Sequence, residues 1–232
     1  MKIKAIKTRV FQPKDDLFLF IGCYLPRIPE KSVLVVTSKI VALAEGRVVK
    51  KNEAVTKEKI IRRESEFVLP TKYVYLTIKD GLVMANAGVD ESNSNGQIIL
   101  LPQDSFRAAA KIRDHFRKKY RLRDFGVIIT DSRCLPLRAG IVGVALGYAG
   151  FKGLKDYQGQ PDIFGRPFQY SRVDIADSLA TAAVVCMGEG REKQPLALIS
   201  GAPIEYTNRL DKDELKIDIR DDMYGPLFRK IK

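Results

Sequence analysis

Residues Phe125–Ser132 read FGVIITDS, and this stretch sets the pattern for the rest of the chain. Its first six residues, Phe125–Thr130, are apolar or β-branched, which predicts a buried strand. A stretch of the same kind, Ser32–Thr37 (SVLVVT), runs into Ser38-Lys39 and then into a short helical segment, Ile40–Ala44. Both predicted strands therefore end in side chains that can bind ions or phosphate.

Outside these two strands, helical and extended segments mix without a regular period, which predicts an α+β fold. Apolar spacing and N-cap residues predict four longer helices. These cover Asp16–Leu25, Asn52–Glu66, Asp104–Tyr120 and Val173–Met187. Further strands are expected at the N-terminus around Ile3, at Tyr73–Ile78 and Leu82–Asn86 on either side of a Lys79-Asp80-Gly81 turn, at Ile98–Leu101 and at Leu196–Ser200. We expect one domain over residues 1–232, with room for two structural subdomains.

The composition is that of a globular protein, with 45% apolar and 29% charged residues among 232. The net charge of +12 favours anionic partners, such as a nucleotide or a nucleic acid. The dense basic stretch Arg113–Arg123 has no nucleic-acid-binding motif around it, so a solvated basic face is favoured over nucleic-acid binding. The single histidine, His115, is expected at the surface.

Three cysteines without paired spacing predict buried or neutral free thiols in a reducing compartment. The N-terminus lacks the apolar segment of a signal peptide, and the longest apolar stretch, Ala139–Phe151, is too short to span a bilayer as a helix. We therefore expect a cytoplasmic protein without a membrane span.

Two aspartates, Asp90 and Asp131, each close an apolar strand and open a polar loop. Carboxylates at strand ends can converge on a hard cation such as Mg²⁺ or Mn²⁺, which then bridges to phosphate oxygens. Ser132 adds a hydroxyl beside Asp131. The alternative is that both aspartates only cap turns.

Glycine-containing loops offer further candidates. After the last helix, Gly188 and Gly190 could let backbone N–H groups approach a phosphate, although Gly188 also suits a helix C-cap. Ser38-Lys39 could hold phosphate, but P-loop and Rossmann glycine motifs are both absent. Arg138 and Arg166 could pair with a substrate carboxylate or phosphate, or form surface salt bridges.

Taken in order, the segments resemble the coenzyme F420-0:γ-glutamyl ligase family. The resemblance runs from about residue 33 to residue 201, and the combination of N-A-G-V-D-x-S-N with I-T-D-S is its most specific part. The matching segments are Val35–Lys39, Ala44–Arg47, Asn86–Asn93, Leu100–Pro102, Val127–Ser132, Gly143–Gly147, Lys155–Gly159, Asp162–Arg166, Ala176-Asp177 and Met187–Gly190.

The resemblance implies a GTP- or ATP-dependent ligase with two divalent cations, Mg²⁺ or Mn²⁺. A carboxylate acceptor is activated as an acyl phosphate, which the amine of L-glutamate attacks. By matched position, the metal ligands are Asp90, Asp131, Ser132 and Glu189. The implied nucleotide contacts are Ser38, Lys39, Asn93, Gly188, Glu189, Gly190 and Arg9. Arg138 is assigned to catalysis with the two aspartates, and the implied architecture is a two-part α+β fold forming an intertwined homodimer.

The chain departs from the family pattern at three places: the N-terminal segment Ile6–Pro13, Leu43 where a lysine is frequent, and Cys134–Arg138 after the metal motif. The last change bears on the acceptor, so a folate that already carries glutamate stands as the alternative to F420-0. The first two leave open a nucleotide-binding protein without turnover.

Overall fold

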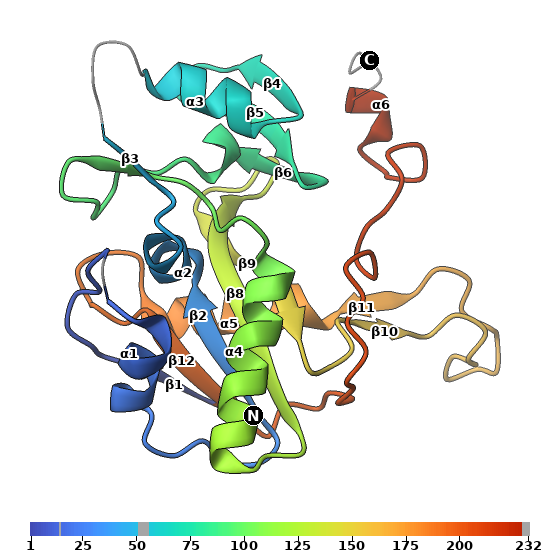
Figure 1. Cartoon of the computed structure of the whole chain (residues 1–232). Coiled ribbons are helices and arrows are strands. Elements are labelled where there is room, and N and C mark those ends of the chain that lie inside the picture. Colours follow the sequence, from blue (N-terminus) through green and yellow to red (C-terminus); the bar gives the residue numbers. More distant parts are fainter. Residues whose placement is uncertain (14, 51–55, 229–232) are drawn as a thin grey trace. The chain divides into compact units, whose positions relative to one another are not determined.

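The computed structural model describes residues 1–13, 15–50 and 56–228, which fall into two compact units (Figure 1). Unit 1 consists of Met1–Arg47 and Pro102–Lys212, and unit 2 of Val48–Leu101 and Asp213–Lys232. Helices and several separate sheets occur together, so the fold is α+β as predicted.

Unit 1 is built on a five-stranded sheet in the order β1-β12-β2-β8-β9. The strands are β1 (Lys2–Ile6), β12 (Leu196–Ser200), β2 (Ser32–Thr37), β8 (Phe125–Cys134) and β9 (Ile141–Ala149). β2 and β8 pair in parallel, and the other neighbours pair antiparallel. The central strands are buried, which explains why their sequences are continuous apolar runs rather than alternating ones.

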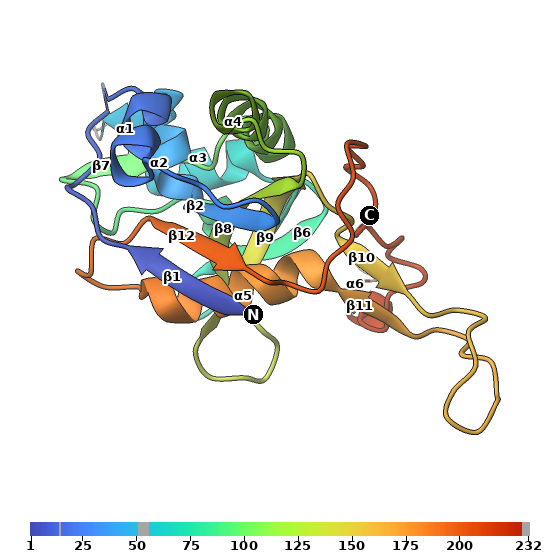
Figure 2. The ribbon, with the colours of Figure 1, turned by 90° about the horizontal axis from the view of Figure 1, so that it is seen from below.

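Helices cover both faces of this sheet (Figure 2). One face carries α1 (Leu17–Tyr24), α2 (Ser38–Ala44) and α4 (Ser105–Tyr120), and the other carries α5 (Ile175–Met187). The helices predicted from Asp16 and from Asp104 are confirmed, and each of these aspartates accepts a hydrogen bond from an N–H of the first turn. The last predicted helix begins two residues later than expected, because Arg172–Asp174 forms a short strand, β11.

The hairpin of β8 and β9 contains a bulge. Ile129 faces Gly147 and Thr130 faces Ala145, so Leu146 is an extra residue on β9. Such a bulge interrupts the alternation of side chains along β9, so that residues before and after Leu146 alternate between the two faces of the sheet in opposite phase. No strand was predicted for β9, whose glycines made the sequence resemble a loop.

Two of those glycines determine how closely the helices pack. A Cβ atom on Gly143 would lie 2.5 Å from the carbonyl oxygen of Ala180 in α5, and one on Gly147 would lie 2.4 Å from the backbone nitrogen of Phe106 in α4. Both contacts are shorter than any side chain allows. The glycines of β9 thus let a helix backbone lie directly on each face of the strand.

A long hairpin arm leaves unit 1 between Leu154 and Asp174. Its base is the pair β10 (Leu154–Asp156) and β11 (Arg172–Asp174), and it projects away from the sheet in both views (Figures 1 and 2). The arm exposes large apolar side chains, namely Ile163, Phe164, Phe168, Tyr170 and Val173.

Unit 2 combines a two-stranded and a three-stranded antiparallel sheet. Its elements are β3 (Val48–Lys50), α3 (Lys57–Glu64), β4 (Phe67–Pro70), β5 (Tyr75–Lys79), β6 (Leu82–Ala85), the 3-10 turn η1 (Asn86–Gly88), β7 (Gln97–Ile99) and α6 (Gly225–Phe228). The predicted hairpin is confirmed: Asp80 and Gly81 both have positive φ, as a tight two-residue turn requires. Of the predicted helix over 52–66, the structure shows 57–64; residues 52–55 lie outside the described residues.

Several expectations about single residues change. The three cysteines are free, as predicted, but they are exposed, so of the two alternatives, buried or neutral thiols, the buried one is wrong. His115 is exposed, but Arg113 in the same basic stretch is only 6% exposed and donates hydrogen bonds to Phe125 O (2.8 Å) and Asn208 Oδ1 (2.7 Å). Arg113 therefore belongs to the interior rather than to a solvated basic face. Within the described residues, no helix has the length and apolarity needed to cross a membrane.

Candidate functional site

The centre of the candidate site in unit 1 is the edge where two parallel strands end. Thr37 of β2 lies opposite Thr130 of β8. The next residues are Ser38, which begins α2, and Asp131. Asp131 lies inside β8, which continues to Cys134 by pairing with β9, so the prediction that Asp131 closes its strand is wrong. The carboxyl ends of adjacent parallel strands form one edge, which is where α/β proteins commonly bind ligands. The structure thus brings the predicted phosphate-binding pair Ser38-Lys39 to the same edge as Asp131.

A third segment joins this edge from the loop after α5. The hydroxyl of Ser132 donates a hydrogen bond to the carboxylate of Glu189. With Asp131 beside Ser132, this edge offers two carboxylates and a hydroxyl, which are the hard oxygen donors that Mg²⁺ and Mn²⁺ prefer. The chemistry of these donors fits the predicted metal. In the part of the chain that the structure describes, no group of three or more His, Cys, Asp or Glu side chains is close enough to hold an ion.

The loop that carries Glu189 is tied to two neighbouring segments. The Thr8 N–H donates to Lys193 O at 2.8 Å, and the Thr37 N–H donates to Pro195 O at 3.0 Å. The loop is therefore held beside both the end of β2 and the segment that follows β1.

The two glycines of this loop have different partners. The Gly188 N–H donates to Val184 O at 2.9 Å, so this glycine ends α5 as a C-cap, as one of the two alternatives predicted. The Gly190 N–H donates to the carboxylate of Glu192 at 2.8 Å. An anionic oxygen therefore already binds the N–H of Gly190. The predicted phosphate contacts of Gly188 and Gly190 stay predictions.

Arg9, predicted as a nucleotide contact, is held by its own neighbourhood. Its guanidinium forms a two-pronged ion pair with Asp15 and lies over the Phe20 ring at 5.2 Å from the centroid. The hydrogen bonds from Arg9 hold the pKa of the Asp15 carboxyl below its usual range. The role of Arg9 toward a nucleotide stays a prediction.

Arg138 lies farther along the β8–β9 hairpin. It is exposed in the turn beyond the last strand pair, Cys134↔Ile141, whereas Asp131 is three residues inside β8. Three residues of strand span roughly 10 Å. Arg138 therefore lies farther along the hairpin than the oxygen donors, and its predicted catalytic role stays a prediction.

The second predicted aspartate, Asp90, belongs to unit 2. Its backbone forms a two-way bridge with Ile99, and its carboxylate accepts hydrogen bonds from the Ser92 N–H (2.7 Å) and hydroxyl (2.6 Å). Asn93 follows with φ of 50°, in the left-handed region that asparagine tolerates. The turn-capping alternative is thus realised at Asp90. Its predicted convergence with Asp131 stays a prediction, since the two residues belong to different units.

One polar pair at this edge was not predicted as part of the site. Arg133, next to Ser132, places Nη2 3.1 Å from the carboxylate of Asp177 in α5, and Asp177 also accepts from the Ala145 N–H at 2.9 Å. Asp174 caps the same helix, and burial raises its pKa to about 6. Only the Ala176-Asp177 match to the family pointed to this region, because nothing in the strand pattern indicates a helix partner for Arg133.

The fold and the edge formed by β2 and β8 together define an α+β protein that presents oxygen donors and a lysine where the parallel pairing of two strands ends. Residues 5–201 match the family model described as F420-0:Gamma-glutamyl ligase. The chain is 35% identical over 207 residues to a coenzyme F420:L-glutamate ligase of Methanococcus maripaludis, covering 82% of this chain and 83% of that protein. It is 34% identical over 212 residues to the enzyme of the same name from Methanopyrus kandleri, with 83% of each chain covered.

A third relative, the coenzyme F420:L-glutamate ligase of Methanocaldococcus jannaschii, is 33% identical over 207 residues, with 82% of this chain and 83% of the relative covered. The matched region includes β2, β8, α5 and the Glu189 loop in unit 1, and the Asp90 segment in unit 2. The chain belongs to the F420-0:γ-glutamyl ligase family.

Proposed function

We propose that this protein is a nucleoside-triphosphate- and divalent-metal-dependent ligase that joins L-glutamate to a carboxylate acceptor, with coenzyme F420-0 as the acceptor. The single observation that carries the proposal is the meeting of Ser132 with Glu189 beside Asp131, at the edge that also holds Ser38-Lys39. Oxygen donors for a cation and a cationic side chain for phosphate lie together there. Family membership supplies the glutamate-ligase chemistry.

In the proposed reaction, an oxygen of the acceptor carboxylate attacks the γ-phosphorus of the nucleoside triphosphate. The bond to the β-phosphate breaks, and the nucleoside diphosphate leaves. The amine of glutamate then attacks the carbonyl carbon of the acyl phosphate. Inorganic phosphate leaves, a proton is released and the amide bond remains. Each step develops negative charge on phosphate oxygens, so fixed positive charge and positioning supply much of the rate.

The residues divide this work between them. Asp90 and Asp131 would serve as metal ligands, Ser132 would serve a second metal, and Glu189 would be a further ligand. Bound Mg²⁺ or Mn²⁺ offsets the charge of the triphosphate and polarises the γ-phosphoryl group. Lys39 and Ser38 bind phosphate oxygens, with Asn93, Arg9 and the Gly188–Gly190 loop as the remaining nucleotide contacts. Arg138 orients the acceptor carboxylate. GTP and ATP are both candidates for the nucleotide.

A folate acceptor is the second candidate, and the β8–β9 turn favours considering it. The turn departs from the family pattern at Cys134–Arg138, and Leu137 in its centre is fully exposed. Leu137 is not covered by the described part of unit 1, so its side chain is available to contact the ring of a different acceptor. The two acceptors share every step of the chemistry above.

We further propose that the protein forms a homodimer through the arm between Leu154 and Asp174. Ile163, Phe164 and Tyr170 are more than four-fifths exposed there, which is costly for a side chain that stays in water. A Phe164→Ser variant should shift the mass measured by light scattering from dimer to monomer. A monomeric wild-type protein would contradict the proposal.

The activity is tested by measuring phosphate release with GTP or ATP, Mg²⁺ or Mn²⁺, L-glutamate and either F420-0 or folate. The proposal expects release that requires glutamate and one acceptor together, with the glutamylated product detected by mass spectrometry. Nucleotide binding without any glutamate-dependent release would identify a protein that has lost turnover, and would overturn the ligase proposal.

A further inference from the structure

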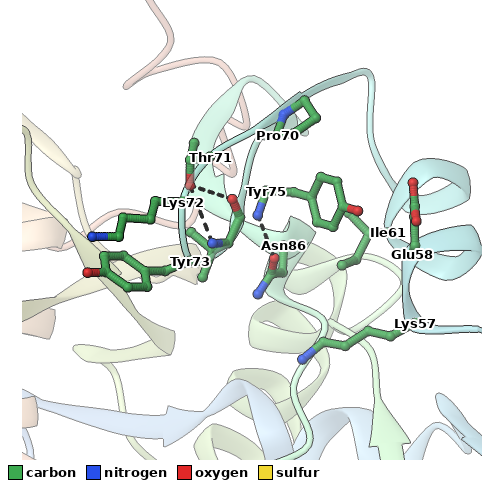
Figure 3. A pocket seen from close by; sticks show the side chains of 10 residues that line it. Lys57, Glu58, Ile61, Pro70, Thr71, Lys72, Tyr73, Tyr75 and Asn86 are labelled. Atoms are coloured by element: carbon green, nitrogen blue, oxygen red, sulfur yellow. Dashed lines mark hydrogen bonds between the residues drawn. The ribbon is translucent and has the colours of Figure 1, made fainter.

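Unit 2 contains a pocket that the proposed chemistry does not use (Figure 3). It has a volume of about 280 Å³ and is formed by the first turn of α3, the turn between β4 and β5, and η1. The residues that carry its polar and aromatic surface are Lys57, Glu58, Lys72, Tyr73, Tyr75 and Asn86. Ligand pockets usually measure about 300–1,000 Å³, so this one suits a small aromatic molecule of one or two fused rings rather than a nucleotide.

The donors of the pocket are positioned by hydrogen bonds. The Tyr75 N–H donates to Asn86 Oδ1 at 2.9 Å, which turns the amide nitrogen of Asn86, a donor, toward the pocket on the same side as the Lys57 ammonium group (Figure 3). The turn before Tyr75 is closed by the Thr71 N–H, which donates to Val74 O at 3.0 Å. Two donors therefore face one space from separate elements, α3 and η1.

The charge in the pocket is positive. The one carboxylate that lines it, Glu58, accepts from Arg62 Nε at 3.0 Å and Nη2 at 2.9 Å, so its charge is already offset. Lys57 forms a long ion pair of 3.7 Å with Glu91, and the Lys72 ammonium lies 5.1 Å from the Tyr73 ring centroid. An anionic group in the pocket would gain from both ammonium groups without meeting an uncompensated carboxylate.

The pocket also offers a flat apolar surface. Tyr73 lines the pocket, yet its side chain is 84% exposed, which is a large exposed area for an aromatic ring. An exposed aromatic ring at the mouth of a cationic pocket is suited to stacking against another ring. We propose that this pocket binds an aromatic carboxylate, whose ring lies against Tyr73 and whose carboxylate pairs with Lys57 and the Asn86 amide.

The position of the pocket in the chain suggests which molecule fills it. η1 leads directly into Asp90, and Lys57 contacts Glu91, the residue after Asp90. The occupant is then a ring of the acceptor, bound here through an anionic group other than the carboxylate that reacts. This last assignment rests on the proposed ligase function, whereas binding of an aromatic carboxylate does not.

Binding is tested by calorimetry on the full chain with 2-naphthoate, and with 2-naphthamide as the uncharged ligand of the same shape. We expect naphthoate to bind about 10-fold more tightly, which is the gain from a charge-assisted hydrogen bond. Lys57→Gln should abolish that preference. Lys59→Gln, on the same helix but outside the pocket, should change the affinity less than about twofold, because a charge in water is screened.

The stacking surface is tested separately. Tyr73→Ala should weaken naphthoate binding by about 3- to 10-fold, whereas Tyr73→Phe, which keeps the ring, should retain it. Because Tyr73 is exposed, we expect both variants to fold as the wild type does, and a thermal melt checks this. Equal affinity for naphthoate and naphthamide, or unchanged affinity in both Lys57→Gln and Tyr73→Ala, would overturn the pocket proposal.

The two proposals fail in distinguishable ways. Glutamate-dependent phosphate release with an unchanged acceptor KM in Lys57→Gln and Tyr73→Ala would leave the ligase intact and remove the pocket from it. Tight naphthoate binding without glutamate-dependent release from any acceptor would keep the pocket and overturn the ligase. A raised acceptor KM with an unchanged nucleotide KM in both variants supports both proposals.

Discussion

Ser132 donates a hydrogen bond to the carboxylate of Glu189, although 57 positions separate the two residues in the chain. The contact joins the end of β8 to the loop after α5. It is the contact from which the predictions on metal binding follow.

Asp131→Asn removes one negative charge from the proposed cation site while keeping the size of the side chain. We expect glutamate-dependent phosphate release to fall by at least about 100-fold, the upper range for changes that weaken a metal site. Stopped assays of phosphate and amide product measure the effect. Asp114→Asn, an exposed aspartate on α4, is the matched control and should retain activity. Wild-type rates in Asp131→Asn would contradict the site.

Ser132→Ala tests the hydroxyl. The variant loses one oxygen donor and the partner that orients Glu189, so the concentration of Mg²⁺ or Mn²⁺ for half-maximal rate should rise about 10-fold. Excess metal should restore most of the rate. Ser178→Ala, an exposed serine of α5, serves as control. A lower rate with an unchanged metal requirement would show that Ser132 acts in another way.

The Arg133–Asp177 pair is expected to matter for stability. Its side chains are 26% and 20% exposed, and Asp177→Ala would leave the Arg133 guanidinium and the Ala145 N–H without this acceptor. We expect a loss of about 3 kcal/mol in the free energy of unfolding, measured in urea.

The matched control for that change is the exposed pair of Lys152 and Glu205, 2.6 Å apart. Glu205→Ala should cost less than about 1 kcal/mol, because exposed ion pairs contribute little. Equal losses in the two variants would show that burial does not distinguish the pairs.

Asp174 gives a pH dependence whose sign can be stated. Burial raises its pKa from 3.8 to about 6, so between these values the folded state holds a proton that the unfolded state has released. This group therefore makes the protein less stable as the pH rises toward about 6, and its contribution is constant above that.

Asp174→Asn cannot titrate but keeps an N-cap acceptor for α5. Subtracting the wild-type free energy of unfolding from that of the variant should give a difference that grows in favour of the variant between pH 4 and pH 6. Chemical denaturation at several pH values measures it. A difference that does not change with pH would show that the Asp174 pKa is ordinary.

The sequence predicted those elements in which one local signal dominates. The strands β2 and β12 match the predicted ranges because every residue except one terminal serine in each is apolar or β-branched. The helices α1 and α4 match because Asp16 and Asp104 cap them. The strand β9 was missed because Gly143 and Gly147, which usually weaken strands, are there for contacts with helices that are distant in sequence.

The candidate site divides in the same way. Ser38 could be placed at a strand end from the apolar run that precedes it, whereas Asp131 lies inside a strand that pairing with β9 extends to Cys134. Their meeting at one edge depends on the parallel pairing of β2 with β8, which no local pattern encodes. Glu189 came from the resemblance to a family, and the role of Asp177 became visible only from the contact with Arg133.

The bulge at Leu146 makes the length of β9 more critical than its composition. Gly143 and Gly147 are four positions apart, which in a regular strand would place them on the same face; the extra residue Leu146 places them on opposite faces, against α5 and α4. A second residue inserted between them would turn one of these glycines away from its helix, and the side chain of a neighbour would press on the helix instead. Insertions in this part of β9 should therefore be far less tolerated than substitutions at its exposed positions, and a library of single-residue insertions through the hairpin would locate the constraint directly.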